Sequence, residues 1–190
     1  MQRLREHIEA ITSITDEEFE YIQTFFTLKK VRKNQFLLHE GDEVKHEFLA
    51  LDGIYKVFYI DENGREHILQ FAKKNWWMSD YIGFFKQQNS KMFVECLKDG
   101  EVVSLTLQGR EQLASEFHKM DHFFRIKLTN GYIALQQRIV LLLSSTPQQR
   151  YEEFIRLYPD LISEIPKKYI AEYLGVSRET LSRLYSNSNK

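Results

Sequence analysis

The chain has 190 residues, enough for one large domain or two modest ones, and its hydrophobic content of 43% is that of an ordinary globular protein. Its formal net charge of −1 excludes a global electrostatic attraction to nucleic acid or to an anionic membrane, although a few well-placed cations can still read DNA locally. The longest apolar run, Ile139–Leu143, is far too short to span a membrane, and Met1–Glu9 lacks the apolar core of a secretory signal.

The first predicted element is a helix over Ile14–Phe26. Thr15 is a suitable N-cap, and Glu18, three residues later, completes the T-x-x-E pattern of a capping box. Phe19, Ile22 and Phe26 follow at helical spacing, so we expect one apolar face that packs on a core.

The stretch from Leu28 to about Leu107 is predicted to form short strands, because segments rich in Val, Ile, Phe and Tyr alternate with turn signals. Four dipeptides contain a glycine able to supply the positive φ that tight turns need: Gly41-Asp42, Asp52-Gly53, Asn63-Gly64 and Asp99-Gly100. Asn63-Gly64 is a strong hairpin signal and predicts the pairing of Gly53–Ile60 with Arg65–Phe71. Regular short strands with frequent turns indicate a sandwich or barrel.

A long helix is predicted over His118–Ser145, which contains no proline and a single glycine. Its apolar residues occupy more than one face: Phe124, Ile126, Leu128, Ile133, Leu135, Ile139 and Leu142. One face would be enough to pack on a barrel, so the surplus predicts a partner helix from a second copy. A core helix inside a monomer is the open alternative. Pro147 is expected to end the helix and to make Ser144–Pro147 a hinge.

Residues 167–186, KKYIAEYLGVSRETLSRLYS, have the spacing of a helix-turn-helix. Small Ala171 allows the two helices to cross closely, Gly175 makes the turn, and neither helix interior contains a proline. Ser177 is placed to cap the second helix, and Glu179 lies in its first turn, where a negative charge is favourable. The predicted shared core consists of Ile170, Leu174, Val176, Leu181 and Leu184.

The outer face of the second helix carries side chains that could meet base edges in the major groove of DNA. With the inward positions assigned, this face holds Glu179, Ser182, Arg183 and Ser186, and Arg178 projects from its N-terminal end. Two arginines and a fit at every structural position favour DNA reading over a plain antiparallel helix pair with a solvated charged face.

This segment resembles the recognition helix of the Crp/Fnr superfamily of regulators, on the residues Ser177-Arg178-Glu179-Thr180 followed by Arg183. The resemblance implies base contacts from Arg178, Glu179 and Arg183, and phosphate contacts from Ser177 and Thr180. The chemistry agrees, since an arginine fork suits guanine and a carboxylate can accept from cytosine. The full predicted DNA-binding set is Lys167, Lys168, Ser177, Arg178, Glu179, Thr180, Ser182 and Arg183.

The resemblance extends over nearly the whole chain. Phe36–Asp42 and Phe48–Val57 are similar to the opening strands of the family's β-roll, and Asp61–Glu66 is similar to its hairpin tip. It implies an α+β fold: a sensor over residues 1–117 built as a double-stranded β-helix (a jelly-roll-like β-roll of the cyclic-nucleotide-binding kind), a dimerisation helix over 118–145, and a helix-turn-helix domain over 146–190. The implied partners are a second copy of the chain, double-stranded DNA with a two-fold symmetric operator, a small-molecule effector and RNA polymerase.

Three departures from the family pattern affect the sensor. Family members that bind cyclic nucleotide carry Gly-Glu for the ribose, Arg-Ser for the cyclic phosphate and Thr-Ser on the long helix for the base. Asp80 is one methylene shorter than glutamate, and Lys91 lacks the planar fork of arginine and is expected to face the other way on a strand. We therefore expect no binding of cyclic AMP in the family's manner. The matching positions here form a candidate effector pocket of undecided content: Ser79, Asp80, Ser90, Lys91, Phe123 and Phe124.

No metal or cofactor is expected. The one cysteine, Cys96, can neither ligate an iron–sulfur cluster nor form an intramolecular disulfide, which fits a reducing, cytoplasmic setting. Scattered histidines such as His39, His46 and His67 are more often surface or core residues than haem ligands. An enzyme of the double-stranded β-helix type would need clustered metal ligands, and no recognised ligand spacing is found in the set His39, Glu40, Asp42 and His46.

A further departure lies at the C-terminal end, where only the polar tail Ser186–Lys190 follows Tyr185. The family places a β-hairpin wing after its recognition helix, so we expect weaker phosphate anchoring and a smaller salt dependence of DNA binding. The sequence thus predicts a dimeric, sequence-specific transcription regulator and no enzyme. The alternative is a ligand-binding regulatory module whose helical tail contacts protein instead of DNA.

Overall fold

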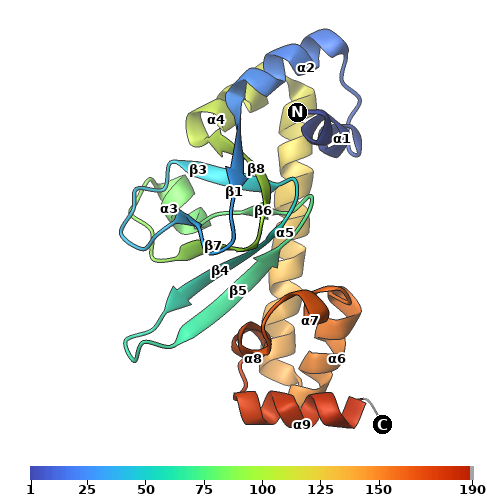
Figure 1. Cartoon of the computed structure of the whole chain (residues 1–190). Helices are drawn as coiled ribbons and strands as arrows, with labels where there is room; N and C mark the ends of the chain where they lie inside the picture. Colours follow the sequence, from blue (N-terminus) through green and yellow to red (C-terminus); the bar gives the residue numbers. More distant parts are fainter. Residues whose placement is uncertain (189–190) are drawn as a thin grey trace. The chain divides into compact units, whose positions relative to one another are not determined.

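The computed structural model describes residues 1–188 and has the α+β architecture that the sequence predicts (Figure 1). The chain divides into two compact units, one formed by Met1–Tyr59 with Gln70–Thr129 and the other by Ile60–Leu69 with Asn130–Lys190. The helices are α1 (Gln2–Glu9), α2 (Asp16–Ile22), α3 (Tyr81–Lys86), α4 (Leu107–Glu116), α5 (His118–Ser144), α6 (Pro147–Leu157), α7 (Leu161–Glu164), α8 (Lys167–Leu174) and α9 (Arg178–Ser188). The strands are β1 (Phe26–Val31), β2 (Phe36–Leu38), β3 (His46–Ala50), β4 (Ile54–Ile60), β5 (Glu66–Ala72), β6 (Trp77–Met78), β7 (Phe93–Lys98) and β8 (Gly100–Thr106).

The strands of residues 1–188 form two four-stranded sheets, with the orders β1-β8-β3-β6 and β2-β7-β4-β5. Apart from the consecutive strands β4 and β5, neighbours in a sheet are distant in sequence. Strand β1 pairs antiparallel with β8 from Phe26↔Leu105 to Val31↔Gly100, and β3 pairs antiparallel with β8 on its other side. This order is that of a roll rather than a meander, and it confirms the predicted β-roll. The boundaries of the three predicted domains stay a prediction.

The interior of the roll is apolar because alternate residues of each strand point inward. On β4 and β7 the inward residues include Tyr55, Val57, Val94 and Cys96, which are buried in one cluster. Burial raises the pKa of the Cys96 thiol to about 11, so this cysteine is an unreactive core residue at neutral pH.

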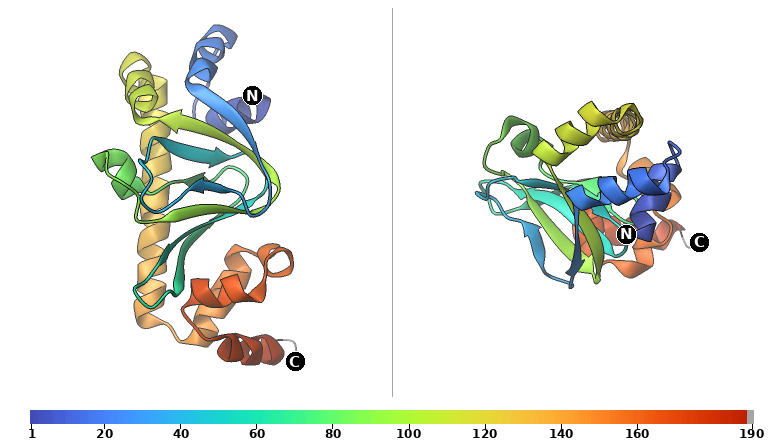
Figure 2. Two further views of the ribbon diagram at one scale, coloured as in Figure 1. Left: turned by 60° about the vertical axis from the view of Figure 1, so that its left-hand side comes forward. Right: turned by 90° about the horizontal axis from the view of Figure 1, so that it is seen from above.

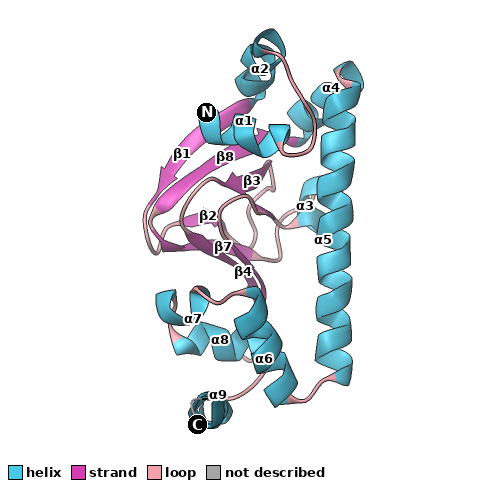
Figure 3. Ribbon diagram, turned by 90° about the vertical axis from the view of Figure 1, so that its right-hand side faces the viewer, coloured by secondary structure: helices cyan, strands magenta, loops and turns pink. Residues whose placement is uncertain are grey.

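Helices α1, α2, α4 and the start of α5 pack on the outer face of the β1–β8 pair (Figure 3). Val103 and Leu105 of β8 belong to this layer, where Leu4 of α1 and Phe123 of α5 are fully buried. Helix α1 is not among the elements predicted from the sequence. Its eight residues have no side-chain cap, and a helix of that length is marginal in water, so its packing on the roll stabilises it.

His7 connects α1 to the roll. Its Nε2 accepts a hydrogen bond from Trp77 Nε1 over 3.2 Å, and its ring meets Phe123 edge-on at a centroid distance of 5.6 Å. Burial, with the Lys127 ammonium as a second cause, lowers the pKa of His7 to about 4. The imidazole is therefore neutral at physiological pH.

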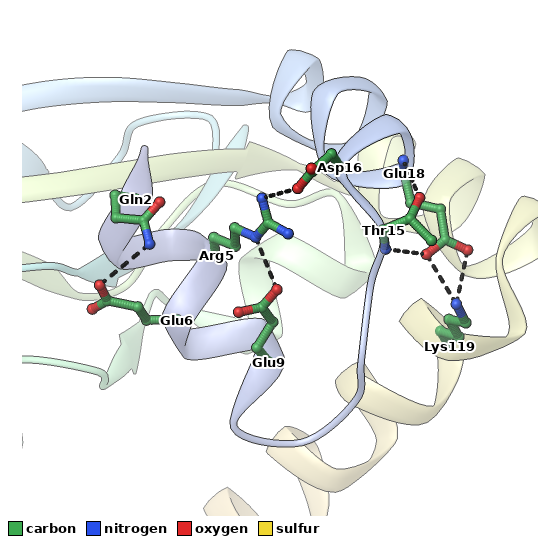
Figure 4. Close-up of polar contacts among 8 residues, drawn as sticks. All are labelled: Gln2, Arg5, Glu6, Glu9, Thr15, Asp16, Glu18 and Lys119. Carbon is green, nitrogen blue, oxygen red and sulfur yellow. Dashed lines mark hydrogen bonds and ion pairs between the residues drawn. The ribbon is translucent and has the colours of Figure 1, made fainter.

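The predicted capping box at Thr15 is confirmed (Figure 4). Thr15 Oγ1 accepts from the Glu18 N–H over 3.2 Å, and the Glu18 carboxylate accepts from the Thr15 N–H over 2.8 Å. The same carboxylate receives Lys119 Nζ of α5 at 2.9 Å. The predicted end of this helix is wrong, because α2 stops at Ile22, a short 3₁₀ segment follows, and Phe26 opens β1. Pairing with β8 overrides the helical spacing of Phe26.

Two of the predicted turns pack against each other. Gly53, between β3 and β4, has φ +86° as predicted, and a Cβ there would lie 2.7 Å from the carbonyl oxygen of Lys98. The prediction of a positive φ at Gly100 is wrong. Gly100 is needed for space instead, since a Cβ at this position would clash with the carbonyl group of Asp52.

The hairpin between β4 and β5 forms from the two predicted strands, but with a longer loop than a two-residue Asn-Gly turn. Gly64 has φ +75°, whereas Asn63 does not have a positive φ. Asp61 Oδ1 accepts from the N–H groups of Asn63 and Arg65 at 3.0 Å each, so an aspartate side chain organises the loop.

The long helix is confirmed and ends at Ser144, within the predicted hinge Ser144–Pro147, whose flexibility stays a prediction. Pro147 is the first residue of α6, where its missing N–H costs no helical hydrogen bond. Thr146 caps this helix: its Oγ1 accepts from the Gln149 N–H over 3.3 Å, and Gln149 Oε1 accepts from the Thr146 N–H over 2.9 Å. Thr146 and Pro147 thus define where α6 begins.

Helices α6 to α9, coloured orange and red in Figure 2, lie next to one another. Tyr151 and Phe154 of α6 are buried, as are Ile170 and Leu174 of α8. Of the predicted polar tail, Ser186–Ser188 continue α9, and the last two residues lie outside the described part of the chain. No helix in the described part is both long and apolar enough to cross a membrane.

Candidate nucleic-acid interface and sensor site

Helices α8 and α9 form the predicted helix-turn-helix. Gly175 follows the last residue of α8 in the left-handed conformation, with φ +66°, which a side chain bearing a Cβ rarely adopts. Ser177 Oγ then accepts a hydrogen bond from the Thr180 N–H over 3.2 Å and caps α9. Both predicted capping signals are confirmed.

The inner faces of α8 and α9 pack as predicted. Small Ala171 is buried, as the close crossing of two helices requires. With these faces occupied, Arg178, Ser182 and Arg183 remain on the exposed side of α9. The buried apolar set is Ile170, Leu174, Val176, Leu181 and Leu184.

A concavity of about 290 Å³, here named the basic hollow, lies between α8 and α9. Its lining consists of Lys167, Lys168, Arg178, Leu181 and Ser182. The structure therefore brings four of the predicted DNA-binding residues around one depression, three of them cationic. Such a surface can donate to phosphate oxygens and to base-edge acceptors at the same time.

The other predicted residues lie beside the basic hollow on the first turns of α9. Ser177 Oγ and Thr180 Oγ1 are 3.2 Å apart, and Arg183 Nη2 lies 3.5 Å from Thr180 Oγ1. The hydroxyl of Ser177 holds the pKa of Glu179 below its ordinary value, so this side chain is a carboxylate that only accepts hydrogen bonds. The exposed side of α9 thus combines forked donors with one acceptor.

Tyr185 belongs to this surface, although it is not among the residues predicted from the sequence. Lys167 Nζ lies 3.8 Å from the centroid of the Tyr185 ring, a cation–π contact that joins α8 to α9. The signal was available, because Tyr185 follows Ser182 by three residues and so lies on the same side of α9.

Three predicted sensor residues, Asp80, Ser90 and Lys91, come together at the start of α3. Asp80 is buried, and its Oδ1 accepts from the N–H groups of Ile82 and Gly83 at 3.0 Å each. Its Oδ2 accepts from Ser90 Oγ–H over 3.1 Å and from the Lys91 N–H over 3.0 Å. The donors of two chain segments are therefore already paired with one internal carboxylate.

Ser79 and the side chain of Lys91 do not join this network. Ser79 Oγ–H donates to the carbonyl oxygen of His46 over 2.9 Å, and the Lys91 side chain is exposed. The prediction that Lys91 lies on a strand is wrong, because β7 begins only at Phe93. A hydrogen bond from the Lys91 N–H to Asp80 Oδ2 holds a bend at this position instead.

Phe123 and Phe124 are packed elsewhere, in the cluster beneath α1. The Arg110 guanidinium carbon lies 4.1 Å from the centroid of the Phe124 ring, and Arg110 Nη1 donates to Glu47 Oε1 over 2.6 Å. Both members of this ion pair are buried. The pair is not predictable from the sequence, because its members are 63 residues apart and no local spacing links them.

His39 has a local structural role in the roll. His39 stacks on Phe36 with ring centroids 4.4 Å apart, and its backbone N–H donates to Asp42 Oδ2 over 2.9 Å. Within residues 1–188, no group of three or more His, Cys, Asp or Glu side chains is placed to hold a metal ion.

Comparison with known proteins adds matches along the whole chain. Residues 28–117 match the family model of the cyclic nucleotide-binding domain. The regulatory protein HlyX of Actinobacillus pleuropneumoniae is 23% identical over 192 residues, which cover 94% of this chain and 78% of that protein. The fumarate and nitrate reduction regulatory protein of Yersinia pestis is 25% identical over 193 residues, covering 94% of this chain and 75% of that protein.

Among solved structures, FixK2 from Bradyrhizobium japonicum superposes with a TM-score of 0.74 at 17% sequence identity. The superposition covers 85% of this chain and 83% of that chain. The sequence matches therefore span both the roll and the helix-turn-helix, and the structural match shows the same fold.

Proposed function

Because the chain belongs to the Crp/Fnr family of transcription regulators and carries a sensing domain of the cyclic-nucleotide-binding type, we propose that it reads double-stranded DNA as a homodimer. The observation that carries the proposal is the basic hollow between α8 and α9, with the forked donors of Arg178 and Arg183 on the exposed side of α9. Arginine forks match the O6 and N7 acceptors of guanine, and the lysines of α8 suit phosphate.

The dimer is inferred from an exposed apolar seam on α5. Its residues are separated by alternating intervals of four and three, the a/d pattern of a two-stranded coiled coil. Leaving such a seam in water is unfavourable, and a second α5 packed in parallel would bury it. The seam consists of Leu128, Tyr132, Leu135, Ile139 and Leu142, all of them exposed, Tyr132 by 68%.

A parallel pair of α5 helices presents two copies of α9 related by a two-fold axis. We therefore expect an operator of two inverted half-sites, with centres about 34 Å or one helical turn apart. RNA polymerase is the remaining proposed partner, since a regulator bound near a promoter acts on it. The proposal places this activity in the cytoplasm, where bacterial DNA is.

We further infer that the roll does not take a cyclic nucleotide in the manner of the family. The backbone and hydroxyl donors around Asp80 already bind its carboxylate, so a phosphate would have to displace an anion that is held by four hydrogen bonds. The effector is therefore of different chemistry, or the regulator works without one. Equilibrium dialysis with cyclic AMP should give no saturable binding, and a stoichiometric plateau would contradict this inference.

The DNA-binding proposal is tested by selecting bound duplexes from a random pool at moderate and raised salt. A two-fold symmetric consensus is expected, and each of Arg178→Ala and Arg183→Ala should weaken binding to it by about 5- to 100-fold. The matched control is Arg156→Ala on α6, where the arginine pairs with Glu153 instead of facing the hollow. If no duplex is preferred, or if Arg156→Ala weakens binding as much as Arg178→Ala, the proposal is wrong and a protein-binding role for the helical tail is favoured.

A further inference from the structure

Arg138, on α5, connects the β4–β5 hairpin to α8. Its Nη2 donates to the carbonyl oxygen of Ile68 over 2.9 Å and to that of Tyr173 over 2.8 Å. Its guanidinium carbon also lies 3.6 Å from the centroid of the Tyr173 ring. All three residues belong to the same compact unit, formed by Ile60–Leu69 and the C-terminal helices. One side chain therefore holds a hairpin backbone and a helix backbone together.

Tyr173 makes this connection rigid. Its ring lies 5.5 Å from the ring of Phe154 on α6 and 6.0 Å from that of Tyr158, centroid to centroid, and all three are buried. A guanidinium suits this position, because its Nη2 serves both carbonyl oxygens while its carbon lies over the Tyr173 ring. Because α8 is fixed in this way to the hairpin, side chains of β5 have defined neighbours on α8.

One such neighbour is Lys168, which lines the basic hollow. Its Nζ lies 3.7 Å from Glu66 Oε1 of β5 and 3.5 Å from Glu172 Oε1 of α8. Both glutamate side chains are less exposed than the lysine side chain that they face. The hairpin thus brings a negative charge to a lysine that would otherwise pair with a DNA phosphate. The Glu66 carboxylate and the phosphate compete for the one cation of Lys168.

We propose that the β4–β5 hairpin is a built-in brake on DNA binding, in which Glu66 substitutes for a DNA phosphate at Lys168 and Arg138 keeps the hairpin on α8. The proposal rests on the proposed DNA-binding function and adds a regulatory element to it. Glu172 stays beside Lys168 on the same helix, so withdrawal of the hairpin changes the surroundings of Lys168 by the one charge of Glu66. Any event that displaces the hairpin therefore separates Lys168 from Glu66 and leaves Glu172 beside it.

The test is a double-mutant cycle on the selected operator, read by fluorescence anisotropy of a labelled duplex with the full chain. Glu66→Gln removes the charge and keeps the shape, and it should tighten binding about two- to fivefold, the range expected for a partly exposed ion pair. The gain should shrink as salt is raised, because salt screens both competing pairs. In a Lys168→Gln background, Glu66→Gln should change nothing.

The matched control is Glu62→Gln, which removes the same charge from an exposed position on the same hairpin. It should leave the affinity within twofold of the unmodified protein. If Glu62→Gln tightens binding as much as Glu66→Gln, or if the gain persists without the lysine, the effect is long-range charge repulsion and the brake does not exist.

Arg138→Lys gives a second, independent readout. The variant keeps the positive charge and loses the Nη2 group that donates to both carbonyl oxygens and the guanidinium that lies over the Tyr173 ring. The hairpin should therefore detach more readily and DNA binding should tighten. Weaker binding by a variant that remains dimeric in sedimentation velocity would mean that the hairpin supports DNA binding, which overturns the proposal.

The failures of the two proposals are distinguishable. If the unmodified protein selects no operator, the DNA-binding function itself is wrong. If it selects an operator that depends on Arg178 while Glu66→Gln behaves like Glu62→Gln, only the brake is wrong.

Discussion

Lowering the pH should destabilise the first compact unit through one histidine. His7 is buried between Trp77 and Phe123, and its Nε2 is an acceptor for the Trp77 indole N–H. Protonating this nitrogen removes the acceptor and places a positive charge in an apolar layer that already faces Lys127. Folding therefore favours the neutral ring.

The size and sign of the effect follow from the pKa of His7, which is about 4 in the folded protein against 6.5 for a free histidine. The unfolded chain takes up the proton first, so the stability that depends on neutral His7 is fully present above pH 6.5, falls as the pH drops, and is lost below about pH 4. At about 1.4 kcal/mol per pKa unit the complete loss is about 3 kcal/mol. About 2 kcal/mol of it should already be gone at pH 5.

The assay is urea unfolding followed by circular dichroism at pH 7, 6 and 5, at one protein concentration so that any dimerisation contributes equally. His7→Gln keeps an acceptor for Trp77 and removes the titrating group. Its free energy of unfolding should fall less between pH 7 and 5 than that of the unmodified protein, by about 2 kcal/mol. His118→Gln removes an exposed histidine and should match the unmodified protein. Equal pH slopes for the unmodified protein and His7→Gln would refute the reasoning.

Three further predictions concern packing and assembly. Arg110→Met should lower the free energy of unfolding in urea by about 3–5 kcal/mol, because it leaves Glu47 buried without its cation. The double variant with Glu47→Leu should recover much of this loss, and no recovery would mean that the loss is one of packing. Gly100→Ala should lower the free energy of unfolding by about 1–3 kcal/mol, since its Cβ clashes with the Asp52 carbonyl group, and an unchanged urea midpoint would contradict the tight turn. Leu135→Glu should convert the proposed dimer to a monomer in sedimentation velocity, because it places a charge in the apolar seam of α5. The monomer should stay folded, since Leu135 is already exposed in the single chain, and a persistent dimer would place the interface elsewhere.

Features encoded within one element were predictable from the sequence. The capping box at Thr15, the left-handed Gly175 and the Ser177 cap each depend on residues that are three or four positions apart, and all were placed correctly. The apolar spacing that buries Leu181 and Leu184 is equally local. The helix-turn-helix and its exposed donors could therefore be assigned before the structure.

Errors occurred where a distant segment decided the conformation. Phe26 carries a helical spacing, yet it opens β1 because β8, far along the chain, offers it a pairing partner. Gly100 was predicted to need a positive φ, whereas the neighbouring turn at Asp52 requires its small size. Lys91 was predicted on a strand, but Asp80 captures its N–H and holds a bend.

The order of elements, the roll and the helix-turn-helix follow from the sequence alone, because strand turns, helix caps and apolar periodicity are encoded in short stretches of chain. The pairing of the donors around Asp80 and the contact between the β4–β5 hairpin and α8 emerge only in the tertiary structure. The Asp80 carboxylate accepts from donors that lie around it. Arg138 donates to the carbonyl oxygens of Ile68 and Tyr173, which are more than a hundred residues apart in sequence. Such contacts depend on which segments the fold brings together, and no spacing within a single helix or strand records them.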